Sequence, residues 1–244
     1  MTDKATSLFL TNLIAPGYLP GFLASPLQVA RDALDGVGRF DLVEIVYGVD
    51  FKGLFGQEQV PYGVVARSAS GGQLFCAIRG TDSVKEWLED GWAVPEPWPF
   101  ASAGVRTHKG FTDLYETLTV GVTKLSDYLR PHTPIVTGHS LGAALANLLA
   151  ADLGPDCLSC TTFEGPRVGD LAFTQWMDAH VPSFFRYVII GDVVPHAPPE
   201  NLGYFHAGTE IDMDPSGVIP LTLDPLKYLA DHHVLASVQK LLLA

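Results

Sequence analysis

The sequence predicts an α/β fold, with helices on both faces of a mostly parallel central sheet. Short apolar strands alternate with helix-like segments through most of the chain, and such alternation is typical of parallel βαβ units. The length of 244 residues fits one domain, and 47% hydrophobic against 17% charged residues supplies the apolar surface of a large core. We therefore expect residues 1–244 to form a single doubly wound α/β domain.

The elements are expected in the following order. Two apolar, β-branched stretches, 62–66 and 73–78, flank a Ser- and Gly-rich turn and predict a β-hairpin. Helices are predicted over residues 84–89, 111–129, 141–153, 170–180 and 225–243. Strands are predicted over residues 135–137, 161–163, 184–190 and 209–213. Such sheets bind ligands beyond the carboxyl ends of their strands, so the residues after each strand are the candidates for a site.

Composition and charge exclude several classes of protein. The apolar content excludes a disordered chain. Acidic residues outnumber basic ones by 27 to 15, and the net charge of −12 argues against nucleic acid as a partner. Three cysteines are an odd number, which argues against a disulfide framework, and Cys157 with Cys160 supplies only half of a zinc site. Free thiols are expected.

The first thirty residues predict neither a membrane helix nor a convincing signal peptide. Pro16, Pro20 and Pro26 interrupt the uncharged stretch 5–30, which disfavours an integral membrane segment. The basic start that a signal peptide needs is missing. We expect a soluble protein, with secreted and cytoplasmic locations both left open.

A candidate nucleophile follows the strand predicted at 135–137. Gly138-His139-Ser140-Leu141-Gly142 is a G-x-S-x-G sequence between that strand and an Ala- and Leu-rich helix, the context that a nucleophile elbow requires. The sharp turn leaves no room for side chains beside the serine, and it raises the Ser140 hydroxyl above the sheet. The start of the helix makes the Leu141 amide a candidate oxyanion donor. His139 is expected to pack or hydrogen-bond rather than act as the base.

A serine nucleophile needs a base, and the base needs an orienting carboxylate. The α/β-hydrolases supply these groups in the chain order serine, acid, histidine. Asp192 follows the strand predicted at 184–190 and is the strongest candidate for the acid. Two adjacent histidines near the start of the last helix are candidates for the base. His232 is preferred, and His233 is the alternative.

Six sequence motifs occur in the order that one known family shows. They are Arg79-Gly80-Thr81, Trp87-Leu88-Glu89-Asp90, His108-Lys109-Gly110-Phe111, the elbow, Gly165-Pro166-Arg167-Val168-Gly169 and Asp192-Val193-Val194-Pro195-His196. From about residue 74 onward the chain resembles the class 3, fungal-type triacylglycerol lipases of the α/β-hydrolase superfamily. The resemblance implies Asp192 as the triad acid and matches an Asp-His pair before the last helix to Asp231-His232. Two features depart from the family: the histidine is doubled, and residues 1–60 have no clear match.

The resemblance also implies an oxyanion hole and its support. The family has a serine or threonine after the strand that ends near Arg79, which makes Thr81 the second oxyanion donor through its amide and hydroxyl. Asp90 matches the acid that anchors this hydroxyl in the family. His108 and His206 match residues of the family's framework and are expected to be structural.

A lid is expected over residues 83–100. Three of the four tryptophans lie in this short segment, which follows the oxyanion threonine as the family's lid does. Acidic residues among these aromatic ones fit an amphipathic flap over the crevice. The residues expected to cover the crevice or bind substrate are Trp87, Leu88, Trp92 and Trp98.

Together these expectations describe a carboxylic ester hydrolase, with triacylglycerol as the favoured substrate and an acyl-Ser140 intermediate. No metal or organic cofactor is expected. The partners would be an acylglycerol or other ester and, transiently, a lipid–water interface. Two alternatives stay open. One is an esterase for soluble short-chain or feruloyl-type esters, and the other is a catalytically silent binding module with a hydrolase fold.

Overall fold

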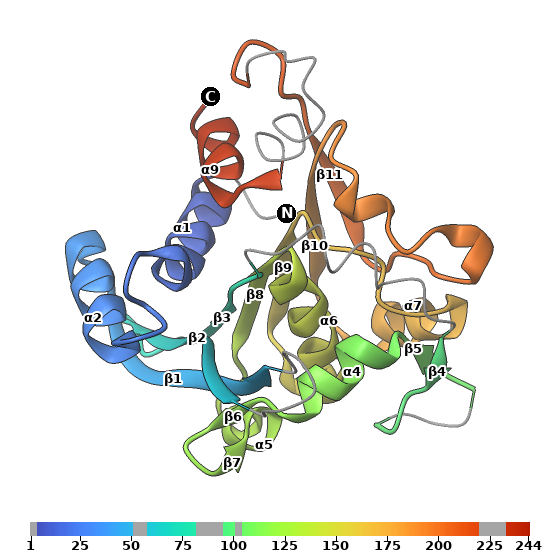
Figure 1. Ribbon diagram of the computed structural model, residues 1–244, viewed down its shortest axis with the longest axis horizontal. Helices are drawn as coiled ribbons and strands as arrows, with labels where there is room; N and C mark the ends of the chain where they lie inside the picture. The colour runs from blue at the N-terminus through green and yellow to red at the C-terminus, as the bar shows by residue number, and fades with distance from the viewer. Residues whose placement is uncertain (1–3, 51–57, 82–94, 101–103, 220–232) are drawn as a thin grey trace.

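A computed structural model describes residues 4–50, 58–81, 95–100, 104–219 and 233–244 (Figure 1). Within these ranges one large sheet has the strand order β11-β10-β9-β8-β3-β2-β1-β6-β7. The two-residue strands β4 (Glu96–Pro97) and β5 (Arg106–Thr107) form a separate antiparallel pair. Helices lie on both faces of the large sheet (Figure 1). The predicted α/β class is confirmed.

Half of the large sheet is parallel and carries the residues predicted for the site. Its strands are β3 (Leu74–Ile78), β8 (Ile135–His139), β9 (Ser159–Phe163), β10 (Phe184–Ile189) and β11 (Thr209–Met213). The strands predicted after residue 130 are therefore confirmed, with small differences at their ends. Because these strands are parallel, their carboxyl ends share one edge of the sheet.

The other half of the sheet is antiparallel. Strand β2 (Glu58–Ser68) pairs with β3, with Ala66 opposite Phe75, which confirms the predicted hairpin. Strand β1 (Phe40–Asp50) pairs along β2, and β6 (Thr119–Val120) and β7 (Thr123–Lys124) extend the edge. The sequence analysis made no prediction for β1. Register shifts within β1 break the simple alternation that predicts a strand.

Two groups of helices cover the two faces. One face carries α4 (Lys109–Glu116), α5 (Leu125–Leu129), α6 (Leu141–Leu153) and α7 (Leu171–His180), and the other carries α1 (Lys4–Ile14), α2 (Pro26–Val37) and α9 (Leu235–Leu243) (Figure 1). Short 3-10 helices are η1 (Ala15–Tyr18), η2 (Arg130–His132), η3 (Gly154–Asp156), η4 (Val194–His196) and η5 (Glu200–Leu202). Alternate residues of β3 supply both cores, with Cys76 and Ile78 in the first and Phe75 and Ala77 in the second.

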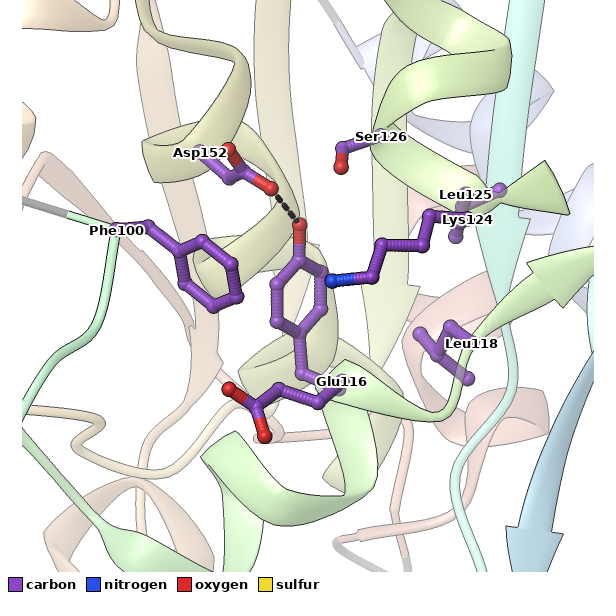
Figure 2. Close-up of a pocket in the computed structure, with 8 residues that line it drawn as sticks. Phe100, Glu116, Leu118, Lys124, Leu125, Ser126 and Asp152 are labelled. Carbon is purple, nitrogen blue, oxygen red and sulfur yellow. Dashed lines mark hydrogen bonds between the residues drawn. The ribbon is translucent and has the colours of Figure 1, made fainter.

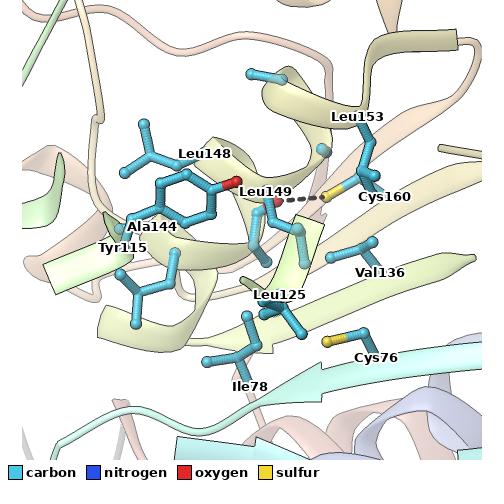
Figure 3. Packing of buried hydrophobic residues seen from close by; sticks show 14 of the residues in the cluster. Cys76, Ile78, Tyr115, Leu125, Val136, Ala144, Leu148, Leu149, Leu153 and Cys160 are labelled. Atoms are coloured by element: carbon cyan, nitrogen blue, oxygen red, sulfur yellow. Dashed lines mark hydrogen bonds between the residues drawn. The ribbon is translucent and has the colours of Figure 1, made fainter. Parts of the chain in front are cut away.

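Helix α6 lies deepest in the fold. Every residue except Asp152 is buried, as expected for a helix that is apolar on all sides. Figure 3 shows its leucines packed over the strands that carry Cys76, Val136 and Cys160. Cys76, Cys157 and Cys160 are all free and buried, so the prediction of free thiols is confirmed.

The helix predicted over 111–129 is wrong as a single element. Helix α4 ends at Glu116, the β6–β7 hairpin follows, and α5 begins only at Leu125. Gly121 has φ 56° in the hairpin turn, and β-branched Thr and Val residues around it favour strands over a helix. The helix expected at 84–89 and the first part of the one expected at 225–243 lie outside the described residues. No helix in the described ranges is long and apolar enough to cross a membrane.

Polar contacts hold α4 and α5 to the carboxyl end of α6. The Tyr115 hydroxyl donates to Asp152 at 2.6 Å beside a small pocket that Phe100 and Lys124 also line (Figure 2). Arg130 pairs with Asp152 at 3.1 Å and with Asp156 at 3.0 Å. These contacts lie at the far end of α6 from Ser140, so we assign them a structural role.

Candidate active site

Ser140 lies at a sharp turn between β8 and α6. Its backbone has φ 58° and ψ −126°, a conformation that residues other than glycine rarely adopt. The Ser140 N–H donates to the Phe163 carbonyl at 3.0 Å, and the Ser140 carbonyl accepts from the Ala143 N–H at 2.9 Å. Backbone strain of this kind costs about 1–3 kcal/mol and is concentrated at functional sites. The turn has the geometry expected of a nucleophile elbow.

Two glycines permit this turn. A Cβ atom on Gly138 would lie 2.2 Å from the Gly142 carbonyl oxygen, and a Cβ atom on Gly142 would lie 2.2 Å from the Ile78 carbonyl oxygen. Backbone atoms at such short distances cannot move aside without displacing β3 or α6. The spacing of glycines around Ser140 therefore has the steric cause expected from the sequence.

Asp192 follows β10 and is buried, with 1% of its surface exposed. Its Oδ1 atom accepts from the Val194 N–H at 3.0 Å, and its Oδ2 atom lies 2.6 Å from His233 Nδ1. Burial opposes ionisation, but the hydrogen bonds and charge of His233, with smaller contributions from Glu164 and Val194, hold the pKa of Asp192 below its usual value. Asp192 is therefore an ionised acceptor directed at an imidazole.

The imidazole that joins the acid to the serine belongs to His233. Its Nε2 atom lies 2.7 Å from Ser140 Oγ, while its Nδ1 atom contacts Asp192. When the Nδ1–H group donates a hydrogen bond to Asp192, Nε2 presents a lone pair to the Ser140 hydroxyl. His233 is 4% exposed, so these hydrogen bonds are shielded from water.

This geometry corrects the preference for His232 as the base. His232 lies outside the described residues. One ring fills the space between Ser140 and Asp192, and both of its nitrogens are engaged there. The sequence does not show which of two adjacent histidines points inward. The alternative, His233, is therefore the candidate base.

The chain segment that leads to Thr81 runs beside the elbow. Strand β3 is parallel to β8, with Ile78 opposite Gly138. A Cβ atom on Gly80 would lie 2.8 Å from the Ser140 Cβ atom, which shows how closely the two segments approach. Leu141 is the first residue of α6, where a backbone N–H has no acceptor within the helix. Both positions fit oxyanion donors, and these roles stay predictions. Asp90 lies outside the described residues.

A model of the family described as "Lipase (class 3)" matches residues 75–202, a range that includes Ser140 and Asp192. The chain belongs to the class 3 lipase family.

Curated relatives and solved structures agree with this membership. A lipase of Rhizomucor miehei is 37% identical over an alignment of 158 residues, and the match covers 60% of this chain and 43% of the relative. A secreted mono- and diacylglycerol lipase of Fusarium solani is 28% identical over an alignment of 148 residues, and the match covers 58% of this chain and 44% of the relative. The structure of the Rhizomucor miehei triacylglyceride lipase aligns with a TM-score of 0.67 at 28% identity, covering 86% of this chain and 80% of that one. The present chain spans less than half the length of the two curated relatives.

In this member of the class 3 lipase family, a second histidine lies behind the elbow and joins three segments. His139 Nδ1 lies 2.7 Å from the Tyr18 hydroxyl, and His139 Nε2 lies 2.7 Å from the His233 carbonyl oxygen. The Tyr18 hydroxyl also accepts from the Gly80 N–H at 2.7 Å. The Tyr18 hydroxyl therefore donates to His139 Nδ1, and the His139 Nε2–H group donates to the backbone carbonyl of His233. His139 hydrogen-bonds, as expected from the sequence.

The His139 ring is held in its neutral form. Burial, followed by the neighbouring His233, lowers the pKa of His139 to about 3. A neutral ring has one donor and one acceptor, which is what Tyr18 and the His233 carbonyl require. Sequence reasoning missed Tyr18, because nothing near it in the chain indicates that it will reach Gly80 and His139. Residues 1–60, which have no clear match in the family motifs, thus contribute a side chain to the site.

The predicted lid lies mostly outside the described residues, and this includes Trp87, Leu88 and Trp92. Trp98 is described, and its assignment as a lid residue is wrong. It is 3% exposed and packs edge-on against Phe173 and Trp176 of α7, with ring centroids 5.5 Å and 6.5 Å away. Trp98 belongs to the core. A cluster of aromatic residues in a sequence does not show which rings lie in the core.

The two histidines expected to be structural hold backbone groups. His108 Nδ1 accepts from the Phe111 N–H at 3.4 Å and caps α4. His206 Nε2 donates to the Pro195 carbonyl at 2.6 Å, and burial lowers the pKa of His206 to about 3.

Proposed function

We propose that this class 3 lipase hydrolyses carboxylic esters, with acylglycerols as substrates, through a covalent acyl-Ser140 intermediate. The observation that carries the proposal is the continuous series of short contacts from Asp192 to His233 (2.6 Å) and from His233 to Ser140 (2.7 Å). Ser140 and Asp192 follow strands of the parallel half of the sheet, at the edge where such folds carry their sites.

The geometry supports a two-step acyl transfer. His233 Nε2 takes the hydroxyl proton as Ser140 Oγ attacks the ester carbonyl, and the carbonyl oxygen becomes an oxyanion. The amides of Thr81 and Leu141, with the Thr81 hydroxyl, donate hydrogen bonds to that oxyanion. The C–O bond to the alcohol then breaks, and His233 returns the proton to the leaving oxygen. Water repeats the sequence on the acyl-enzyme, releasing the carboxylic acid and restoring Ser140.

The choice of acylglycerol substrates is supported by the family and by the names of its members. The relatives are lipases, and one is named a mono- and diacylglycerol lipase. A lid containing Trp87 and Trp92 would expose apolar rings at a lipid–water interface, which favours lipid over dissolved substrates. The competing proposal is an esterase for soluble short-chain or feruloyl-type esters.

The test is a series of p-nitrophenyl esters of increasing acyl length, together with emulsified triacylglycerol, with Ser140→Ala as the control. We expect turnover that extends to long acyl chains and to the emulsion, and none in the control. Turnover confined to dissolved short-chain or aromatic-acid esters would favour the esterase. If no ester is hydrolysed and a fluorophosphonate does not label Ser140, the chain is a silent binding module.

A further inference from the structure

Glu164 is a buried carboxyl group that the proposed mechanism does not use. It follows β9, has φ 50° and is 0% exposed. Its backbone N–H donates to the Tyr187 carbonyl at 2.9 Å, and its Oε1 atom accepts from the Ile189 N–H at 2.7 Å. Both partners belong to β10, the strand that leads to Asp192. The left-handed backbone of a non-glycine residue at this point again indicates a functional constraint.

The Glu164 carboxyl group meets Asp192. One polar side-chain atom from each of Glu164, Asp192 and His233 lies within 4.8 Å of the other two, and all three residues are buried. The one side-chain hydrogen bond shown for Glu164 is the bond that Oε1 accepts from the Ile189 N–H. The Glu164 Oε2 atom is fully buried and has no hydrogen-bond donor among the described residues. Two ionised carboxylates have only acceptors to offer each other, so one member of the pair must carry a proton.

The donors around the pair decide which carboxyl group is protonated. Asp192 accepts from both His233 and the Val194 N–H, whereas Glu164 accepts from the Ile189 N–H. Burial, followed by the neighbouring Asp192, raises the pKa of Glu164 well above its usual value. The proton therefore resides on Glu164, and the single negative charge resides on Asp192.

We propose that Glu164 is a positioning residue: as a neutral carboxylic acid, it donates a hydrogen bond to Asp192 and holds that carboxylate against His233 Nδ1. The inference rests on the proposed function, since the positioning matters for an acyl transfer that uses the triad. A neutral donor fills an acceptor site of Asp192 without placing a second negative charge beside the imidazole.

The first experiment compares Glu164→Gln with Glu164→Met in the full chain. Glutamine keeps an acceptor for Ile189 and a neutral N–H donor for Asp192, whereas methionine keeps the length without a donor. We expect the Gln variant to keep a kcat close to that of the unchanged protein. The Met variant should lose roughly 10-fold to 100-fold in kcat, with KM little changed. Glu116→Gln, at an exposed glutamate, is the matched control. A Met variant with full activity, or a Gln variant as impaired as the Met variant, would overturn the proposal.

The pH dependence of kcat supplies a second readout, which a purely structural role would not change. When Glu164 loses its proton at alkaline pH, the donor disappears and two carboxylates face each other. The unchanged protein should therefore lose activity on the alkaline side. In the Gln variant this loss should move to higher pH or disappear. An identical alkaline limb in both proteins contradicts the proposal.

Infrared spectroscopy tests the proton itself, whether or not any ester is hydrolysed. At neutral pH the unchanged protein and Glu116→Gln should show the carbonyl band of a protonated carboxylic acid, and Glu164→Gln should lack it. A protein without this band, or a band that persists in Glu164→Gln, overturns the assignment of the proton. Because this readout does not require turnover, failure of the proposed function and failure of this inference can be distinguished.

Discussion

The layer of groups proposed to react and the layer behind it come from different parts of the chain. Ser140 and Asp192 follow parallel strands, and His233 precedes the last helix. The supporting residues are Tyr18 near the amino terminus, His139 inside the elbow and Glu164 after β9. In the reacting layer His233 presents a lone pair to a hydroxyl, whereas the supporting groups are neutral and paired with backbone or buried partners. The difference teaches that the reacting residues supply the groups that exchange protons and form bonds, whereas the supporting residues hold those groups in position.

The largest expected effect is the loss of the nucleophile. Ser140→Ala removes the attacking oxygen and should lower kcat on the order of 10⁶-fold, while Asp192→Asn should cost on the order of 10⁴-fold because it stabilises the wrong tautomer of His233. Single-turnover and steady-state kinetics on a dissolved ester measure both losses. Substantial turnover by Ser140→Ala would place the reaction outside the elbow.

A smaller loss is expected where the reacting layer only stabilises charge. Thr81→Val keeps the shape and the amide but loses the hydroxyl, so kcat should fall roughly 10² to 10³-fold with KM little changed. Steady-state kinetics separate the two parameters. An unchanged kcat would leave the oxyanion to backbone amides alone.

The supporting layer should show a smaller effect again. Tyr18→Phe leaves the Gly80 N–H and His139 Nδ1 without their shared partner, which should cost about 1–3 kcal/mol of the free energy of unfolding. We expect kcat to fall roughly 10-fold, as is common for outer partners of site residues. Denaturant unfolding and steady-state kinetics on the same preparations measure both effects. Tyr47→Phe, on strand β1, is the matched control for removal of a tyrosine hydroxyl. A Tyr18→Phe variant with normal stability and kcat would mean that the hydrogen bonds of the Tyr18 hydroxyl support neither the fold nor the site.

The smallest expected effect on turnover separates the core from the predicted lid. Trp98→Ala should lower the free energy of unfolding by about 3–5 kcal/mol, because it empties a packed site. Its kcat per folded molecule should stay unchanged.

Trp87→Ala should instead reduce hydrolysis of emulsified long-chain triacylglycerol far more than that of a dissolved short-chain ester. Equal losses on both substrates would remove Trp87 from the lid.

The sequence was most informative where steric limits are local. Glycine is required at positions 138 and 142 because a Cβ atom at either position would lie closer than van der Waals distance to neighbouring backbone atoms. The motif around Ser140 therefore predicts the turn reliably. Asp192 was identified because parallel strands bring their carboxyl ends to one edge. The helix predicted across 111–129 failed because the β6–β7 hairpin interrupts it, and a single glycine was not read as a turn.

The supporting layer was not predictable, because its contacts join distant parts of the chain. Tyr18 and Gly80 are brought together by packing of η1 against β2, and no pattern near Tyr18 indicates this. Glu164 falls next to a recognised motif, yet its partner is a carboxylate that follows another strand. The choice between His232 and His233 depends on the direction of one side chain.

The most direct test of the central claim is therefore the comparison of His233→Ala with His232→Ala. The two variants remove the same imidazole from adjacent positions, so they differ only in whether the lost ring bridges Ser140 and Asp192. In kcat on a dissolved p-nitrophenyl ester, His233→Ala should lose on the order of 10⁶-fold, and His232→Ala should keep most of the activity. An inactive His232→Ala beside an active His233→Ala would contradict the site described.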